Sequence, residues 1–156
     1  MEHTIRTATR EDLEAVIGLL ADDTLGAGRD TLTAVLDPAY DAAFAAIARD
    51  PNQKIVVMES LQATPGGRII GCMQISYLPG LSRKGMWRGQ IESVRIARDL
   101  RGQGLGRTFF LWAIADCRAR GCGLIQLATD ASRIEAQRFY RSLGFAPSHV
   151  GMKLKL

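Results

Sequence analysis

Apolar side chains recur along this chain with two different periods, one typical of helices and the other of strands. The first set with helical spacing is Leu13, Val16, Ile17 and Leu20. Thr9 and Asp12 precede it with the spacing of a capping pair, in which the Thr9 hydroxyl accepts from the backbone N–H three residues later. We therefore expect an amphipathic helix here, after a short first strand over residues 4–7.

A second helix is expected between Asp37 and Asp50. Pro38 suits the first helical position, where the missing N–H of proline leaves no hydrogen bond unmade. The apolar face of this helix is Tyr40, Phe44 and Ile47. Residues 31–36 are compatible with either a helix or a loop.

The middle of the chain changes to strand patterns. We expect strands over residues 54–61 and 68–78, joined by a turn at 64–67 that contains one proline and two glycines. A loop at 79–88 leads to a further strand at 90–97. These three strands include a hairpin and form the expected centre of a sheet.

From residue 104 the helical period returns, and we expect a helix over 104–120. A short apolar strand at 124–129 follows, and its continuous apolarity predicts burial on both faces in a parallel pair. The next helix, over 132–143, begins with a second capping pair, Ser132 and Glu135. A terminal strand is expected over 145–156.

This order of elements predicts an α/β domain with a mixed sheet. Strand 90–97 and the strand at 124–129 are joined by a helix, which makes them parallel neighbours. Ligands of such units bind at the carboxyl end of the first strand, where the crossover helix begins. The chain shows no internal repeat or linker, so we expect a single domain over residues 1–156.

Composition narrows the class of protein. Of the 156 residues 47% are hydrophobic, which is ordinary for a globular domain. No apolar run reaches the ~18 residues that span a bilayer, and the N-terminus lacks the pattern of a signal peptide. Cys72, Cys117 and Cys122 are odd in number and lack metal-ligand spacing. We therefore expect a cytoplasmic protein with reduced thiols, no metal and no membrane partner.

The net charge of +4 is concentrated in one segment. Seven basic residues lie from Arg83 to Arg107, against two acidic ones, Glu92 and Asp99. This excess favours an anionic partner, either a phosphorylated cofactor or a nucleic acid. Trp87 is the one aromatic residue among these charges, so the stacking groups that nucleic-acid binding uses are sparse. We expect a cofactor here and no nucleic acid.

A glycine-rich turn follows the strand at 90–97. Three alternate glycines let the backbone bend sharply, and the helix that begins there adds unpaired N–H donors and a positive dipole end. Such a turn binds a phosphate or diphosphate. The spacing excludes the dinucleotide-binding and nucleoside-triphosphate-binding glycine motifs. What remains is R-x-x-G-x-G, formed by Arg101, Gly104 and Gly106.

That motif resembles the signature of the GNAT superfamily of N-acetyltransferases. The segment from Ala136 to Phe145 is similar to a second motif of the family, A-x-x-F-Y-x-x-x-G-F. The resemblance covers nearly the whole chain. It implies a central mixed, mostly antiparallel sheet with a splayed parallel pair, flanked by about four helices. It also implies direct transfer of an acetyl group from acetyl-CoA to an amine in a ternary complex.

The resemblance implies a cofactor site at the same turn. Backbone groups of Val94, Arg95 and Ile96 would pair with the pantetheine arm of the cofactor. The pyrophosphate would contact the turn, which comprises Arg101, Gly102, Gln103, Gly104, Leu105, Gly106 and Arg107. Arg133 stands where many relatives carry an asparagine that contacts the cofactor or a water; arginine could instead contact a phosphate or point away.

Two side chains are candidates for the chemistry. Glu92 stands where many relatives carry a glutamate general base, and it could take the amine proton through a water. Its alternative role is that of a salt-bridged strand residue. Strand alternation predicts that Glu92, Val94 and Ile96 share one face. The resemblance places Tyr140 by the thioester sulfur as proton donor, although Tyr140 also fits an apolar helix stripe.

The acceptor amine, a small molecule or a peptide, is expected between the loops at 22–29 and 79–88. Asp22 and Asp23 could attract its charge, and Trp87 could form a wall of the pocket by a cation–π contact. The alternative is that Asp22 and Asp23 are solvated and that Trp87 is a packing residue. The alternatives for the whole protein are a non-catalytic acyl-CoA-binding module and a nucleic-acid-binding module. A homodimer is compatible with the sequence.

Overall fold

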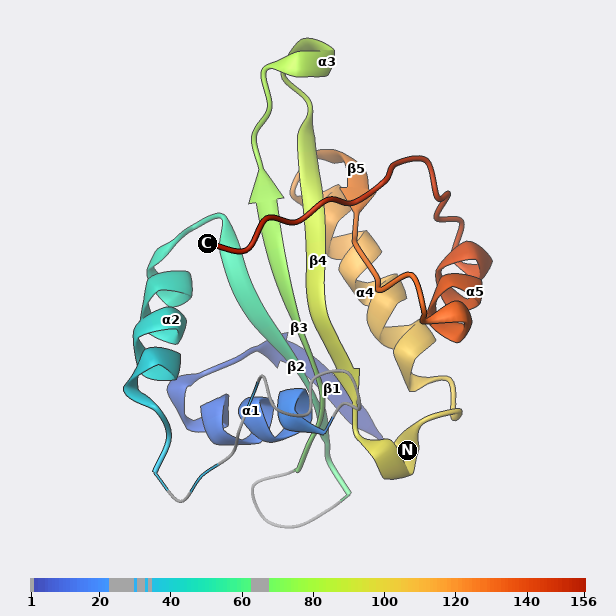
Figure 1. Ribbon diagram of the computed structural model, residues 1–156. Helices are drawn as coiled ribbons and strands as arrows, with labels where there is room; N and C mark the ends of the chain where they lie inside the picture. Colours follow the sequence, from blue (N-terminus) through green and yellow to red (C-terminus); the bar gives the residue numbers. More distant parts are fainter. Residues whose placement is uncertain (1, 23–29, 31–32, 34, 63–67) are drawn as a thin grey trace. The chain divides into compact units, whose positions relative to one another are not determined.

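The computed structural model describes residues 2–22, 30, 33, 35–62 and 68–156. Contacts within the chain divide it into two compact units, residues 1–126 and residues 127–156. The five strands belong to the first unit (Figure 1). In the described ranges, no helix has both the length and the apolarity that crossing a bilayer requires. The turn expected at residues 64–67 lies outside the described residues.

The strands of the first unit form one mixed sheet, and their order in the sheet follows their order in the chain. They are β1 (His3–Thr7), β2 (Gln53–Ser60), β3 (Arg68–Leu78), β4 (Trp87–Ile96) and β5 (Cys122–Gln126). Strands β1 to β4 pair in antiparallel fashion, whereas β4 and β5 are parallel. The predicted mixed, mostly antiparallel sheet with one parallel pair is therefore confirmed. The prediction that the strand at 124–129 is buried on both faces was wrong. That strand is β5, which lies at the edge of the sheet, and its Leu124 is 36% exposed.

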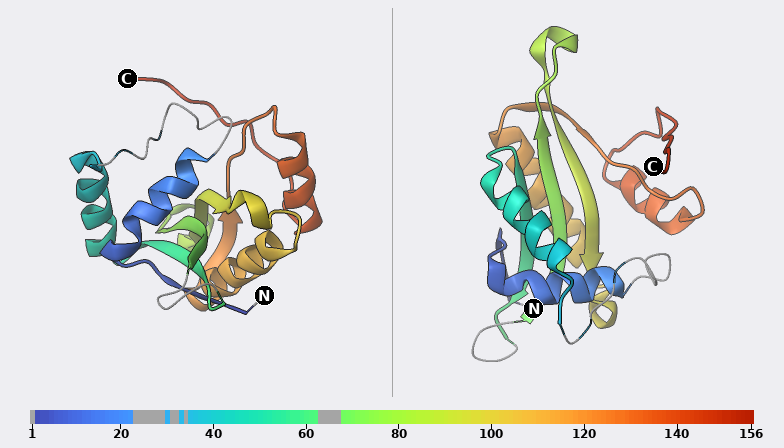
Figure 2. Two further views of the ribbon diagram at one scale, coloured as in Figure 1. Left: turned by 90° about the horizontal axis from the view of Figure 1, so that it is seen from below. Right: turned by 60° about the vertical axis from the view of Figure 1, so that its left-hand side comes forward.

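Helices pack on both faces of this sheet (Figure 2). On one face lie α1 (Leu13–Ala21), which contacts β3 and β4, and α2 (Pro38–Arg49), which contacts β2. On the other face α4 (Leu105–Ala119) packs against β4 and β5. These three helices agree with the sequence prediction because each combines an apolar stripe with a helix-starting residue.

The two faces have separate apolar contacts. On the α1 face, Val16, Val57 and Cys72 form a buried cluster. On the α4 face, a Cβ added to Gly89 would lie 2.6 Å from Sγ of Cys117, so only glycine lets α4 approach β4 this closely. The close approach fixes α4 on β4 and thereby fixes the turn from which α4 begins.

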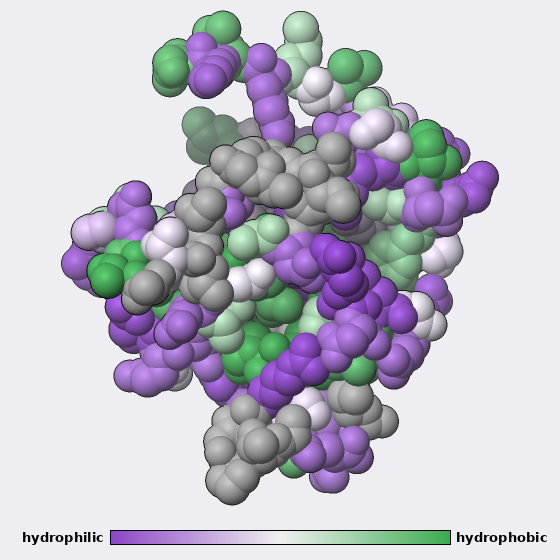
Figure 3. All heavy atoms as spheres, turned by 60° about the horizontal axis from the view of Figure 1, so that its bottom comes forward, coloured by the Kyte–Doolittle hydropathy of each residue, from purple (hydrophilic) through white to green (hydrophobic). Residues whose placement is uncertain are grey.

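Short elements connect the strands and helices. Two 3-10 turns, η1 (Arg10–Asp12) and η2 (Arg98–Leu100), precede α1 and α4. A single helical turn, α3 (Ser82–Gly85), lies at the tip of the β3–β4 hairpin within the expected loop. Figure 3, which brings the bottom of Figure 1 forward, shows hydrophilic side chains in a band across this face, next to hydrophobic ones.

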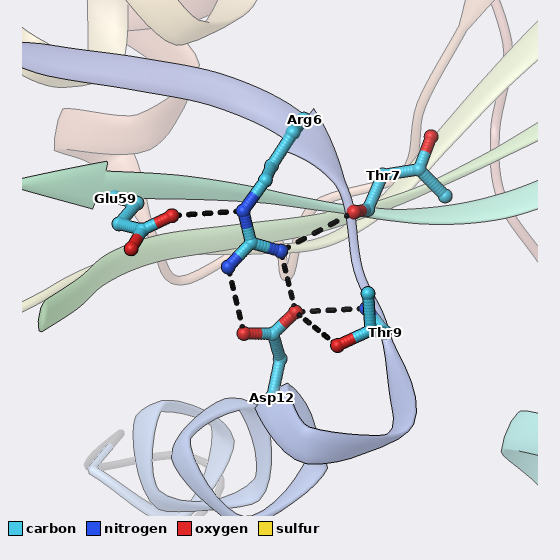
Figure 4. A network of polar contacts seen from close by, with 5 residues as sticks. All are labelled: Arg6, Thr7, Thr9, Asp12 and Glu59. Carbon is cyan, nitrogen blue, oxygen red and sulfur yellow. Dashed lines mark hydrogen bonds and ion pairs between the residues drawn. The ribbon is translucent and has the colours of Figure 1, made fainter. Parts of the chain in front are cut away.

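A polar network joins β1, η1 and β2 (Figure 4). The Arg6 guanidinium donates to both Asp12 oxygens, at 2.6 and 2.9 Å, and its Nε donates to Glu59 at 2.8 Å. Asp12 also accepts from the backbone N–H of Thr9 at 2.8 Å, as the capping pair predicts for its acidic member. The hydrogen bonds from Arg6 hold the pKa of the Asp12 carboxyl below its ordinary value.

Asp12→Asn is expected to lower the free energy of unfolding by about 1.5–3 kcal/mol at pH 7, the usual contribution of hydrogen bonds to charged groups. The lowered pKa means that this stabilisation is present above the ordinary aspartate pKa of about 4 and is lost as pH falls through the folded value. Urea unfolding at pH 7 and at about pH 3 measures both effects. Glu14→Gln, an exposed carboxylate on α1, is the control. If the unfolding free energies of the wild type and Asp12→Asn differed equally at both pH values, the lowered pKa assigned to Asp12 would be contradicted.

The second unit contains α5 (Ile134–Ser142). The capping pair predicted for it does not form, because the Ser132 hydroxyl donates to the Asp130 carboxylate and α5 begins after Arg133. Gly144, with φ 93°, follows the last turn as predicted, and its left-handed backbone favours glycine at this position.

The terminal strand predicted over residues 145–156 was wrong, because the structure contains no strand there. Its alternating apolar side chains are about nine-tenths exposed; they are Val150, Met152 and Leu154. Alternation predicts which side chains share a face of a strand, but a strand also needs a neighbour for its backbone hydrogen bonds. The ladder of described strands ends at β1 and β5.

Candidate active site

The pairing of β4 with β5 ends well before β4 does. Gln90 and Gln126 form the last pair of the parallel ladder, whereas β4 continues to Ile96. Among the five described strands, residues 91–96 therefore pair with β3 alone, and β5 does not extend along the other edge of this stretch. An extended ligand can add to such an edge through backbone hydrogen bonds. The predicted cofactor contacts on this stretch are Val94, Arg95 and Ile96.

A bulge at Ser93 interrupts the alternation of side chains along this stretch. The register passes from the Gln74–Glu92 pair to the Cys72–Arg95 pair, so two residues of β4 oppose one residue of β3. Ser93 has φ 55°, in the left-handed region that is costly for residues other than glycine. Strained backbone of this kind is concentrated at functional sites.

The bulge makes the expectation of a shared face for Glu92, Val94 and Ile96 wrong. The β3 partners of Glu92 and Arg95 are two residues apart, so Glu92 and Arg95 lie on one face, that of α1. The Ile96 side chain points to the opposite face, near Phe109 of α4. Of the β4 side chains proposed for the site, Glu92 therefore faces the α1 side together with Arg95. Glu92 is exposed, as a base that reaches a ligand through water requires.

The turn before α4 has the geometry that the glycine pattern predicts. Gly102 and Gly104 have φ values of 79° and 82°, which glycine adopts without strain. Gly104 is the N-cap of α4, and the first helical hydrogen bond runs from the Thr108 N–H to the Gly104 carbonyl at 3.1 Å. The N–H groups of the first turn have no acceptor inside the helix and carry the positive end of its dipole. This arrangement binds anions.

Arg101, the arginine of the signature, ties three elements together. Its Nε donates to the Ile96 carbonyl at 3.0 Å, and its Nη2 donates to the Asp22 carbonyl at 3.2 Å. Arg98 forms an ion pair with the Asp22 carboxylate at 2.5 Å. The two arginines therefore hold the end of α1 against the end of β4. A contact of Arg101 with the cofactor stays a prediction, as do those of its neighbours in the turn.

Asp22 and Trp87, the described residues of the expected acceptor site, do not lie together. Trp87 is the first residue of β4, whereas Asp22 contacts Arg98 just beyond the last residue of that ten-residue strand. The two positions are about 30 Å apart at the usual rise per residue. Asp22 is bound by arginine, so it is not placed to attract a cationic amine. Asp23 lies outside the described residues.

The basic residues of the segment from Arg83 to Arg107 also divide between these two ends. Arg83 and Lys84 lie in α3 at the hairpin tip, while Arg98 and Arg107 flank the glycine turn. The basic residues seen in the sequence are therefore spread along β4 and beyond both of its ends.

In the second unit, α5 carries both remaining candidates. Arg133 is the exposed N-cap residue of α5. Tyr140 is half-buried, and its ring packs against Phe139 and Phe145 with centroid distances of 5.5 and 6.1 Å. These contacts fix the ring of Tyr140 through its apolar edge. Its role as a proton donor and the cofactor contact of Arg133 stay predictions.

The thiols of the first unit are poor nucleophiles. Burial raises the pKa of Cys72 and that of Cys117 to about 12, and burial also raises the pKa of Cys122. A thiol must lose its proton to react as a nucleophile, so a raised pKa disfavours that role at neutral pH. Among the described residues, no three His, Cys, Asp or Glu side chains form a group that could hold a metal ion.

Sequence reasoning missed two residues that shape the site. A Cβ on Gly71 would lie 2.9 Å from Cδ1 of Ile96 and 3.1 Å from the Arg95 carbonyl oxygen, so Gly71 lets β3 lie against the end of β4. An isolated glycine inside a strand pattern is a signal for such an approach. Ser93 carries no comparable signal, because serine rarely adopts a positive φ.

Comparison with known proteins agrees with this geometry. A family model described as the acetyltransferase (GNAT) family matches residues 14–145. An aminoalkylphosphonate N-acetyltransferase of Salmonella typhimurium is 30% identical over 146 residues, which are 93% of this chain and 86% of the relative. A glucosamine 6-phosphate N-acetyltransferase of Trypanosoma brucei brucei is 32% identical over 92 residues, or 59% of this chain and 60% of the relative.

A solved structure shares this fold. A crystal structure described as a transcriptional regulator from Bacillus halodurans C-125 superposes with a TM-score of 0.92 at 42% identity, covering 99% of this chain and 100% of that one. The family model spans most of the chain, including both sequence motifs, the parallel pair of strands and the glycine turn. This chain therefore belongs to the GNAT family of acetyltransferases.

Proposed function

We propose that this protein transfers an acetyl group from acetyl-CoA to the primary amine of a small molecule, by direct attack in a ternary complex. The observation that carries the proposal is the continuity of the β4 edge beyond β5, the bulge and the glycine turn along residues 90–106. Acetyl-CoA has an extended arm with amide groups joined to a diphosphate. The arm fits the free edge of β4, and the diphosphate fits the N–H groups at the start of α4.

The chain's own residues supply the proton transfers in this proposal. The attacking amine must lose a proton, and Glu92 accepts it through a water from the α1 face of β4. The departing thiolate must gain a proton, which Tyr140 donates. Direct attack is favoured over a covalent enzyme intermediate because Cys72 and Cys117 are buried and keep their protons.

The names of the relatives support a small acceptor. The Salmonella and Trypanosoma enzymes are named for an aminoalkylphosphonate and for glucosamine 6-phosphate, both small amines. The test is release of free CoA from acetyl-CoA with a panel of aminoalkylphosphonates, amino sugars, polyamines, aminoglycosides, amino acids and peptides, with mass spectrometry of the product. Binding of acetyl-CoA without turnover of any amine would instead support a binding module. DNA binding that weakens steeply with salt and ignores CoA would support the nucleic-acid alternative.

Glu92→Gln is expected to lower kcat/KM about tenfold at neutral pH, less than the ~10²-fold typical of a direct general base, because Glu92 acts through water. The carboxamide keeps the shape but cannot accept the proton. The acidic limb of the pH–rate profile should change, while the dissociation constant of acetyl-CoA stays constant.

Glu2→Gln serves as the control, because Glu2 is exposed at the start of the chain, away from β4. Full retention of the wild-type pH–rate profile by Glu92→Gln would show that another group, or selection of the free amine, removes the proton.

A further inference from the structure

A row of uncharged polar side chains crosses four strands of the sheet. Gln53 of β2 pairs with Ser76 of β3, Ser76 pairs with Gln90 of β4, and Gln90 pairs with Gln126 of β5. Directly opposite residues project to the same face, so these four side chains form one line, called here the amide row. Ser76 is four residues after Cys72 on β3, so the row lies on the α1 face.

Hydrogen bonds within the sheet orient the amides of this row. Nε2 of Gln126 donates to Oε1 of Gln90 at 2.6 Å, and Oε1 of Gln53 accepts from Nε2 of Gln74 at 3.1 Å. A carboxamide has an NH2 donor and a carbonyl acceptor, so a hydrogen bond between two carboxamides uses the donor of one and the acceptor of the other. Among the described residues, Nε2 of Gln90 and Oε1 of Gln126 have no partner. The Gln90–Gln126 pair thus presents one donor and one acceptor side by side.

This pair lies next to the stretch of β4 where the acetyl-CoA arm is proposed to bind. It is the last pair of the parallel ladder, at the point where β5 ends and β4 continues. Glu92 is the next residue of β4 on the same face, about 7 Å along the strand. Arg95, the cation that the bulge brings to this face, lies beyond Glu92 on the side away from the row. The row itself contains no charged side chain.

We infer that the Gln90–Gln126 pair determines acceptor specificity, and that the acceptor is an amine with an uncharged hydroxyl group about 5–7 Å from its nitrogen, as in amino alcohols and amino sugars. This inference rests on the proposed acetyl transfer. A hydroxyl both donates and accepts, so it can accept from Nε2 of Gln90 and donate to Oε1 of Gln126. A fully ionised phosphate or carboxylate has no proton to donate to Gln126, and a hydrocarbon leaves Nε2 of Gln90 and Oε1 of Gln126 unpaired.

The experiment compares two amines that differ by one hydroxyl group, trans-4-aminocyclohexanol and cyclohexylamine. Their kcat/KM values and their dissociation constants from the CoA complex, by NMR titration, are measured for the wild type and for Gln90→Met and Gln126→Met. Methionine keeps the length of the side chain and removes the amide. The control is Gln62→Met, because Gln62 is exposed outside the row. Circular dichroism checks folding, and Gln126→Met on the edge strand serves if Gln90→Met does not fold.

The wild type is expected to prefer the hydroxylated amine about tenfold in both measurements, as one hydrogen bond allows, and each variant to lose that preference. An unchanged preference in folded variants, or no wild-type preference, would overturn the inference while leaving acetyl transfer intact. Row-dependent binding of the hydroxylated amine without turnover would support the inference and contradict the proposed function. Neither binding nor turnover of the two amines would overturn the inference, and the wider amine panel would then decide the function separately.

Discussion

Phenylalanine in place of Tyr140 is expected to lower kcat about 100-fold or more, the usual effect of removing a general acid. The substitution removes the phenol oxygen and keeps the ring. The ring contacts of Tyr140 with Phe139 and Phe145 depend on the ring alone, so the stability of α5 should change little. Steady-state kinetics with saturating acetyl-CoA, together with thermal unfolding, measure the two effects.

Tyr40→Phe is the matched control, because it removes a phenol from α2, where the hydroxyl donates to Asp30 at 3.2 Å. Its kcat should equal that of the wild type. The dissociation constant of acetyl-CoA should be unchanged in both variants. If Tyr140→Phe turned over at the wild-type rate, Tyr140 would be a packing residue of α5 and the thiolate would take its proton from water.

The sequence predicted the parts of the fold that depend on local chemistry. The start of α4 follows from the glycines at 102 and 104, whose positive φ values few other residues tolerate. The stop of α5 at Gly144 follows from the same property. The parallel pair of β4 and β5 follows from the helix between them, because a crossover of that length returns in the same direction. In each case the structure follows from the chemistry of a single residue or from the length of one segment.

The sequence failed where the geometry depends on a neighbouring strand. The alternation of Glu92, Val94 and Ile96 is correct for an unbroken strand, but the bulge at Ser93 reverses it for every residue that follows. The bulge arises from the register between β3 and β4, which the β4 sequence does not contain. The same limit applies to residues 145–156, whose apolar alternation predicts a strand only where a partner strand is beside it.

The acceptor site illustrates a third limit. The expected acceptor site, with Asp22 and Asp23 to attract the amine and Trp87 as a wall, assumed that these residues meet at one end of the sheet. Strand β4 separates Asp22 from Trp87 by its whole length, because the hairpin tip and the glycine turn lie at its opposite ends. The amide row was visible in the sequence as glutamines within apolar strands, but only the register shows that Gln90 and Gln126 are neighbours.

Gly104→Val is expected to raise the dissociation constant of acetyl-CoA by about 100-fold or more, which corresponds to losing one or two hydrogen bonds to a charged group. A Cβ on Gly104 would have no protein atom within 4 Å, so valine would not clash with the fold. It would project from the turn toward the space where the diphosphate is proposed to bind. The positive φ of 82° also strains valine, at a cost of about 1–3 kcal/mol in folding.

Gly121→Val separates these two effects. Gly121 has φ 85°, and a Cβ on it would likewise have no protein atom within 4 Å, but it lies at the far end of α4, before β5. Both variants should lose similar stability in urea unfolding, because both force valine into the same backbone region. Calorimetric titration with acetyl-CoA should then show weak binding for Gly104→Val and wild-type binding for Gly121→Val. Equal affinities of the two variants for acetyl-CoA would show that the diphosphate binds away from the glycine turn. The backbone N–H groups at the start of α4 would then bind a different group.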